Sequence, residues 1–334
     1  MKVLFRLALI FATVLALQPE LEIQNEFILF KSKFDKNYNI NEENYRYHIF
    51  RRNLNYIEEM NAKDLPFKLG IGPFADQTYS EFASNYLLPP SNHSQEFLSK
   101  ILILRNNSIP EYKNWVEEGH ISHVENQGNC KSAYAMAATG SIESARSIEL
   151  YRKVIDLSIQ ETIDCNELPG VNGCDGGIGY QVYNYYISQP CIFTEKHMPY
   201  KGEEHKCNEL FLEPYCTEGI LVDWKAVQPF NEAQLALAVN LQPTDSSIYV
   251  NENMQHYSSG ILTSEWCNAP DEVNQEILLV GFGDSQGNPY WIGQNSWGTE
   301  WGMNGYFMVQ RDPSNVNGAG TCNIAYQSFY PITL

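Results

Sequence analysis

The sequence predicts an α+β fold with two lobes, because helical patterns come first along the chain and strand patterns later. In SAYAMAATGSIESARSIELYRK, which begins at Ser132, small apolar residues recur with the period of a buried helix. Beyond Ile220, short runs such as SSIYV, EILLVGFG, PYWIGQNSWG and GYFMVQR are rich in β-branched and aromatic residues and are separated by turn residues. With 334 residues, 43% of them hydrophobic, the chain can bury the core that this fold requires.

The first residues have the pattern of a secretory signal peptide. Lys2 and Arg6 precede an apolar run over residues 7–15, and Val14 and Ala16 fit the small-residue rule for cleavage, so we expect a signal peptide at residues 1–16. That run is too short to cross a bilayer, and no later apolar run is long enough. We therefore expect a protein of the secretory pathway, extracellular or in a lysosome or vacuole, without a membrane span.

The charge of the chain is divided unevenly along its length. Residues 1–108 carry 12 Lys and Arg against 12 Asp and Glu, so the net charge of −18 belongs entirely to residues 109–334. This break indicates two parts with separate roles. The acidic part repels phosphate over long range, which argues against nucleic acid as a partner.

The N-terminal part contains one long helical pattern and a shorter motif. Six residues recur at spacings of three and four and so share one helical face: Glu42, Arg46, Phe50, Asn53, Ile57 and Asn61. This face mixes polar and apolar residues, whereas the face of an ordinary amphipathic helix that packs on a core is apolar. A short segment, FKLGIGPFADQTYSEF, follows it. The next stretch, LLPPSNHSQEF, reads as an exposed linker because it is rich in Ser, Asn and Pro.

All eight cysteines follow the predicted signal peptide. An even number in an oxidising compartment predicts four disulfides, which would leave no free thiol to act as a nucleophile. No CxxC spacing is present, so we expect neither a zinc site nor another metal or cofactor. Asn92 and Asn106 begin N-x-S/T sequons and are candidate glycosylation sites.

Taken in order, these segments resemble the papain-like cysteine peptidases of the cathepsin L type. The resemblance runs from about Phe27 to Ile332. The helical face matches the inhibitory propeptide motif at all six positions, and GIGPFAD matches the second propeptide motif except that Gly72 replaces the usual Asn. IPEYKNW resembles the mature N-terminus, with Asn114 in place of Asp. Further matches are ENQGNC, LSIQETIDC, GCDGG, NSWGTEWGMNGY and GTCNIA.

The resemblance implies a domain organisation. The signal peptide would be followed by a propeptide over residues 17–108, whose inhibitor domain spans about 26–83. The papain-like peptidase domain would span 109–334, with a helical lobe at about 109–220 and a β-barrel-like lobe at about 221–334.

The resemblance also implies three disulfides by position. They are Cys130–Cys174, Cys165–Cys207 and Cys267–Cys322. The resemblance leaves Cys191 and Cys216 without a partner, so these two could form a fourth disulfide with each other.

The family's chemistry needs a thiolate at a helix start, paired with an imidazolium that protonates the leaving amine. Here the resemblance places Ala133 at the nucleophile position and Gln275 at the histidine position, and neither side chain has usable acid–base or nucleophilic chemistry. Gln127, the oxyanion-hole donor, and Asn295, the orienting asparagine, are retained. The resemblance therefore implies an inactive member of a peptidase family.

Three other polar residues near these motifs are candidate replacements for the catalytic pair. Ser132 adjoins Ala133, but successive helix residues point about 100° apart, so its hydroxyl should face elsewhere and cap the helix start. His123 could sit near the rim of the cleft, although a surface role is favoured. His256, in MQHYSSG, reads as a solvent-facing strand residue.

A peptide-binding cleft is expected to remain. By resemblance, Gly176 and Gly177 would pair with a bound peptide backbone as an added strand does. Trp297 would line the cleft or pack between the lobes, and for Trp301 packing is favoured. Ile178 and Tyr180 would shape a pocket for an apolar side chain.

Three functions follow as hypotheses. The first is a pseudopeptidase that binds peptides or proteins in its cleft, with cystatin-like inhibitors or active cathepsins as candidate partners, and that is monomeric. The second is an active hydrolase that uses an unrecognised nucleophile. The third is an acidic storage or structural protein.

Overall fold

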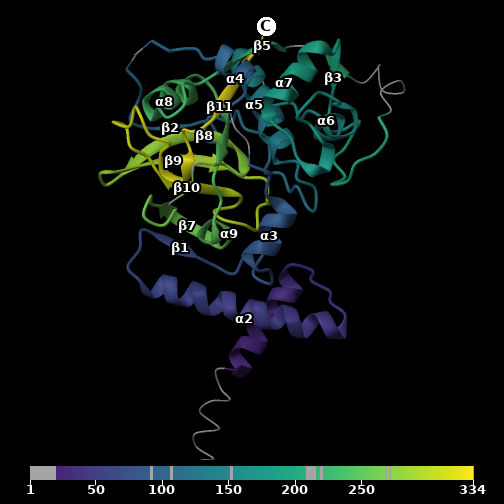
Figure 1. Cartoon of the computed structure of the whole chain (residues 1–334), viewed down its shortest axis with the longest axis vertical. Helices are drawn as coiled ribbons and strands as arrows, with labels where there is room; N and C mark the ends of the chain where they lie inside the picture. Colours follow the sequence, from purple (N-terminus) through teal and green to yellow (C-terminus); the bar gives the residue numbers. More distant parts are fainter. Residues whose placement is uncertain are drawn as a thin grey trace, which may run out of the picture.

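The computed structural model describes residues 20–90, 93–105, 108–150, 153–207, 216–218, 221–267, 269–270 and 272–333. The predicted signal peptide and the sequon residues Asn92 and Asn106 lie outside these ranges. The fold is the expected α+β arrangement of a helical lobe beside a β lobe, with an N-terminal helical domain across one end (Figure 1).

The helical lobe is built around α5 (Ala133–Leu150), a helix buried over most of its length. Its small residues permit close packing: a Cβ placed on Gly140 would lie 3.2 Å from a methyl group of Leu278. The helix packs against both α7 and the sheet. The remaining elements of this lobe are α6 (Ile159–Cys165), η1 (Gly173–Asp175), α7 (Gly179–Ser188) and the hairpin of β3 (Cys191–Phe193) with β4 (Cys216–Glu218).

The β lobe is one twisted sheet of nine strands with the order β1-β7-β10-β9-β8-β6-β11-β5, and β2 pairs with β8 at the side. All neighbours are antiparallel except β7 and β10. After residue 220, β6, β8, β9 and β10 overlap the four runs that the sequence predicted as strands, whereas β5, β7 and β11 lie outside those runs. The turn before Asn288 uses Gln286 and Gly287 at positive φ. The strands are β1 (Phe67–Leu69), β2 (Lys113–Asn114), β5 (Leu221–Ala226), β6 (Thr244–Ile248), β7 (Tyr257–Leu262), β8 (Gln275–Ser285), β9 (Asn288–Gln294), β10 (Tyr306–Gln310) and β11 (Ser328–Thr333).

Short helices complete the β lobe. These are α8 (Glu232–Leu241), α9 (Glu252–Gln255) and η4 (Thr321–Asn323). Trp291, Trp301 and Phe307 are fully buried within its core. Trp301 packs edge-on against Trp297 with ring centroids 4.7 Å apart, so the packing role favoured for Trp301 is confirmed.

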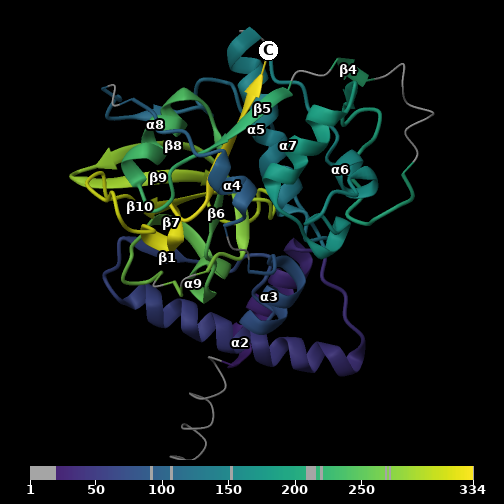
Figure 2. The same ribbon diagram turned by 45° about the horizontal axis from the view of Figure 1, so that its top comes forward.

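The N-terminal domain comprises a helix over residues 20–33, then α2 (Ile40–Ala62), β1 and α3 (Tyr79–Tyr86). Strand β1 pairs with β7, which attaches this domain to the edge of the sheet. Helix α2 lies across the end of the molecule beside β1 and α9 (Figures 1 and 2).

The polar residues on the predicted face of α2 hold the short motif that follows it. Arg46 donates to the Asp76 carbonyl oxygen at 3.1 Å, and the Asn53 amide donates to the carbonyl oxygens of Ala75 and Gln77 at 2.9 and 2.8 Å. Asn61 exchanges two hydrogen bonds with the Leu69 backbone. The mixed polar and apolar order of this face therefore reflects the recognition of a backbone segment rather than simple core burial.

The prediction of an exposed linker after α3 is wrong in part. Leu87 and Leu88 are buried, and α4 (Gln95–Ser99) follows with Phe97 fully buried, whereas Pro89 is exposed. Figure 2 shows α4 in front of the junction between the lobes. The composition is typical of a linker, but the few apolar residues within it are the ones that pack.

The structure contains the disulfides Cys130–Cys174, Cys165–Cys207 and Cys267–Cys322, the three that the resemblance implied. Cys191 is also disulfide-bonded. The side chain of Cys216 lies outside the description, so its pairing stays a prediction. Within the described residues no helix is long and apolar enough to cross a membrane.

Candidate functional site

The start of α5 is fixed from two sides. Ala133 is the first residue of the helix and is completely buried. The Cys130–Cys174 disulfide ties the preceding loop to the segment before Gly176, and the Lys131 amide donates to the Cys174 carbonyl oxygen at 2.9 Å. Both connections hold the N-terminus of α5 at the junction of the two lobes.

Four polar side chains form one hydrogen-bonded group beside this helix start. The Ser296 hydroxyl donates to Gln127 Oε1 at 2.7 Å, and the Gln275 amide donates to Asn295 Oδ1 at 3.0 Å. Gln275 Nε2 also lies 3.3 Å from Ser296 Oγ. The structure thus brings Gln127, Gln275 and Asn295 together, and Ala133 lines the same small cavity as Asn295 and Ser296.

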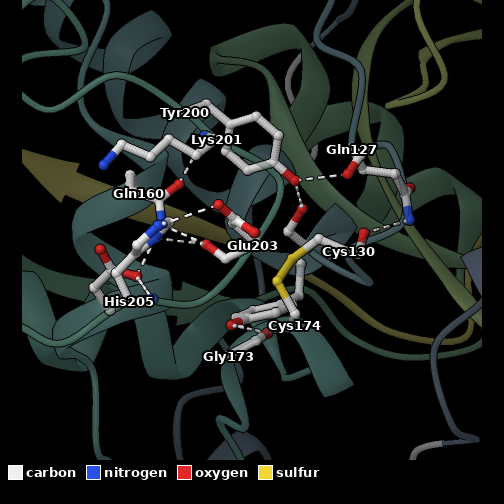
Figure 3. Close-up of a disulfide and its surroundings, with 12 residues drawn as sticks. Gln127, Cys130, Gln160, Gly173, Cys174, Tyr200, Lys201, Glu203 and His205 are labelled. Carbon is white, nitrogen blue, oxygen red and sulfur yellow. Dashed lines mark hydrogen bonds and ion pairs between the residues drawn. A yellow bond between two sulfur atoms is a disulfide. The ribbon is translucent and has the colours of Figure 1, made fainter.

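The hydroxyl group next to Ala133 points away from this group. Ser132 Oγ lies 2.7 Å from the Tyr200 hydroxyl, which donates to the Gln127 backbone oxygen at 2.7 Å. Figure 3 shows the Tyr200 ring directed at that oxygen, beside the Cys130–Cys174 disulfide. The expectation that Ser132 faces elsewhere is confirmed, although its hydroxyl contacts the loop at Tyr200 instead of capping the helix.

The two candidate histidines, His123 and His256, lie in different surroundings. His123 is more than half exposed and contacts the Glu125 carboxylate at 2.8 Å, so it is on the surface as expected. His256 is not the solvent-facing strand residue predicted: it follows α9 and is 1% exposed. It is covered by the N-terminal domain, since Tyr56 of α2 packs near its ring and the Gly70 amide donates to its carbonyl oxygen. Burial lowers the pKa of His256 to about 4.

An extended segment of the N-terminal part crosses the junction between the lobes. The side-chain amide of Gln127 donates to the Tyr86 carbonyl oxygen at 2.9 Å. The backbone amide of Leu88 donates to the Asn274 carbonyl oxygen at 2.8 Å. Leu87 packs into the core of the β lobe and Leu88 into the core of the helical lobe. The chain after α3 therefore lies in a cleft as a bound peptide would.

Gly176 lies in one wall of this cleft, and Gly177 follows it. A Cβ on Gly176 would lie 3.1 Å from Pro89 and 3.2 Å from Leu88, and one on Gly177 would lie 2.6 Å from the Tyr134 ring. Gly176 has a φ of +111°, a conformation that favours glycine. Gly176 therefore lets an extended chain approach the backbone closely, whereas Gly177 makes room for the Tyr134 ring of α5. Tyr180 instead stacks on Trp224 with ring centroids 4.9 Å apart.

Trp297 lies where the cleft meets the N-terminal domain. It is 2% exposed because Phe74 and Phe82 of that domain pack edge-on against its ring, with centroids 5.6 and 5.1 Å away. It also lines an open pocket of about 530 Å³ that Lys33 and Glu300 border.

Buried carboxyl groups near the cleft were missed in the sequence. Glu143 of α5 accepts a hydrogen bond from the Leu157 amide at 2.6 Å, and burial raises its pKa to about 8. Glu276, next to Gln275 in β8, is also buried, and burial raises its pKa to about 8. A glutamate within an otherwise apolar strand pattern was the available signal.

The comparisons with known proteins agree with this geometry. The family described as "Papain family cysteine protease" matches residues 109–332, and "Cathepsin propeptide inhibitor domain (I29)" matches residues 27–82. The chain belongs to the papain family of cysteine peptidases and carries the cathepsin-type propeptide domain.

Individual relatives cover nearly the whole chain. Thiol protease aleurain from Arabidopsis thaliana is 33% identical over 92% of this chain and 83% of its own length. Pro-cathepsin H from Mus musculus is 32% identical over 89% of this chain and 87% of its own length. Among solved structures, a recombinant stem bromelain precursor has a TM-score of 0.79 and 29% identity, covering 93% of this chain and 98% of its own.

Proposed function

We propose that this papain-family protein does not cleave peptides and acts by holding a peptide or protein segment in its cleft. The protein would reside in the secretory pathway, outside the cell or in a lysosome or vacuole. The proposed boundaries are a signal peptide at 1–16, a propeptide at 17–108 and the peptidase-like domain at 109–334.

The loss of catalysis is argued from the group around Ala133. The first residue of α5 is Ala133, whose side chain is a methyl group, whereas the family chemistry requires a thiolate at this position. The Gln275 amide does not titrate near neutral pH and so cannot act as a general acid or base, and its hydrogen bonds to Asn295 and Ser296 hold it in place. Within the described residues no cysteine is free, so no thiol is available nearby to take over the role.

Binding is supported by the propeptide itself, and this observation carries the proposal. The segment from Tyr86 to Pro89 lies extended between the lobes, with hydrogen bonds to Gln127 and Asn274 and close contact at Gly176. Backbone hydrogen bonds of this kind give affinity for an extended chain, whereas side-chain pockets give selectivity. A cleft that holds its own propeptide in this way has the groups needed to hold another chain.

The test is peptide hydrolysis at pH 5 by protein whose propeptide has been removed with an added protease. We expect no hydrolysis by the natural protein, and hydrolysis by the Ala133→Cys/Gln275→His variant, because Gln127 and Asn295 are already in place. The Ala133→Cys single variant is the matched control, since it restores the thiol without the imidazole. Hydrolysis by the natural protein that Gln127→Ala abolishes would favour an active enzyme with another nucleophile.

A further inference from the structure

A second segment of the N-terminal part is held by the peptidase domain outside the cleft. It comprises residues 93–104, which lie between the two regions that match a family. The segment contains α4 and continues as an extended chain beside β5. Figure 1 shows α4 next to β5, β11 and α7, at the opposite end of the molecule from α2. This attachment is therefore separate from that of the inhibitor domain.

Phe97 is the apolar anchor of the segment. Its side chain is fully buried in the core of the helical lobe and approaches the Phe329 ring of β11, with centroids 6.4 Å apart. His93 stacks on Phe97 and on Tyr326, with centroids 5.0 and 4.7 Å away. Its Nε2 atom lies 2.8 Å from the Tyr326 carbonyl oxygen. If the segment left, the slot that holds the Phe97 ring would expose an apolar patch to solvent.

Polar groups of α7 and β5 match the charges of the segment in order. The Asn184 amide donates to the Glu96 carboxylate at 2.7 Å. Four residues later in the segment, Lys100 forms an ion pair with Asp223 and lies over the Trp224 ring, 5.5 Å from its centroid. The surface thus offers a donor to the acidic residue and a carboxylate to the lysine, so it recognises the direction of the bound chain as well as the aromatic ring.

Strand β5 supplies a backbone partner for the extended part of the segment. It is the last strand in the order of the sheet and pairs with β11. Away from β11, the Leu102 amide donates to the Ala226 carbonyl oxygen, and the Ala226 amide donates to the Lys100 carbonyl oxygen, both at 3.0 Å. Leu104 then exchanges two hydrogen bonds with the Gln234 side chain of α8, at 2.8 and 3.1 Å. Addition of an extended chain to a sheet edge is a common mode of peptide binding, and it covers an edge that would otherwise pair with other molecules.

We propose that the peptidase domain has a second chain-binding surface, separate from the cleft, and that residues 93–104 stay bound to it after the chain is cut on both sides of them. We call it the β5 surface, and its residues are Asn184, Asp223, Ala226, Gln234, Tyr326 and Phe329. All the contacts described are non-covalent, and their loss would expose both an apolar slot and a sheet edge. The proposal goes beyond the proposed function, because it concerns another surface and another ligand class: a segment with an aromatic residue on a short helix, followed by a lysine and an extended stretch.

The test uses the full-length chain with the recognition sequences of two site-specific proteases inserted, one between residues 91 and 92 and one between residues 107 and 108. Cleavage at both sites leaves the peptide 92–107 held by non-covalent contacts alone. We expect this peptide to elute with the protein in gel filtration at micromolar concentration and pH 7, where mass spectrometry detects it. Elution of the peptide apart from the protein would overturn the proposal.

Synthetic peptides of residues 93–105 show which contacts hold the segment, without any substitution in the protein. A fluorescent copy of the natural peptide would be exchanged into the doubly cut protein, and unlabelled peptides would compete with it. We expect Leu98→Ala, at a position 43% exposed, to compete within about twofold of the natural peptide. Phe97→Ala should need a concentration about tenfold higher or more, because it lacks the buried ring. Equal competition by the two variants contradicts the proposed surface.

A peptide of residues 84–90, the segment that lies in the cleft, is the second control. The residues that hold this segment, Gln127, Gly176 and Asn274, are not among those of the β5 surface. We therefore expect no displacement of the fluorescent peptide, and displacement would show that the two surfaces are not separate. Neither measurement depends on whether the cleft binds other peptides, so a failure of the proposed function would be distinguishable from a failure of the β5 surface.

Discussion

Asn53 is a buried polar residue whose side chain donates two hydrogen bonds to the backbone. It is 1% exposed, and its amide donates to the carbonyl oxygens of Ala75 and Gln77. We expect Asn53→Ala to lower the free energy of unfolding of the full-length chain by about 1–3 kcal/mol, because two carbonyl oxygens lose a buried donor. Urea denaturation would measure this change. Asn55→Ala, on the exposed side of the same helix, is the control, and an equal effect there would refute the assigned role.

Residues that lie within a family motif could be assigned to the site from the sequence. Residues that matter because the fold buries them could not. Gln127, Gln275 and Asn295 meet as the resemblance implied, because each lies in a short segment whose neighbours are also matched.

The burial of His256, Asp245 and Glu276 was missed because it depends on segments distant in sequence. Helix α2 covers His256, and Gly179 of α7 lies against the two carboxyl groups. The strand TDSSI signals a polar face only once its register with β8 is known.

The positions of helices and strands could be predicted from the sequence better than the exposure of individual residues could. Helices α2 and α5 and the strands β6, β8, β9 and β10 appear where the pattern predicted them, because hydrophobic period and turn residues are local signals. The segment after α3 was misjudged because composition says nothing about one or two buried residues within a polar stretch. In the structure, Lys100 and Leu102 exchange backbone hydrogen bonds with Ala226 of the edge strand β5, and Phe97 enters the core.

Helix α4 accordingly anchors the segment that connects the inhibitor domain to the peptidase domain. Phe97 is fully buried, stacks with the His93 ring at 5.0 Å and approaches Phe329 of β11. We expect Phe97→Ala to lower the free energy of unfolding by about 3–5 kcal/mol, because a buried aromatic side chain leaves a cavity. Leu98→Ala, at a position 43% exposed, should cost much less. Similar midpoints in urea for the two variants would show that α4 does not anchor the chain.

The whole molecule buries several acids that favour their protonated form. Burial raises the pKa of Glu143 and of Glu276 to about 8. In the unfolded chain these groups lose their protons near pH 4.5, so between about pH 4.5 and 8 the folded state binds more protons than the unfolded state. Their contribution to stability is therefore fully present in acid and is lost as the pH rises through the folded pKa. His256 acts in the opposite sense, since its pKa is lowered to about 4 and its contribution is lost as the pH falls from about 6.5.

Because two buried carboxyl groups outweigh one histidine above about pH 4.5, these groups together predict that stability is greatest near pH 4.5 and falls from there to pH 8. We expect the free energy of unfolding to fall by on the order of 2 kcal/mol for each buried carboxyl between pH 5 and pH 8. Urea denaturation at pH 5, 6, 7 and 8 would measure it. Glu143→Gln removes one of the two titrations while keeping the hydrogen-bond acceptor for the Leu157 amide, so its stability should depend less steeply on pH. A natural protein that is equally stable or more stable at pH 8 would mean that these carboxyl groups are ionised within the fold.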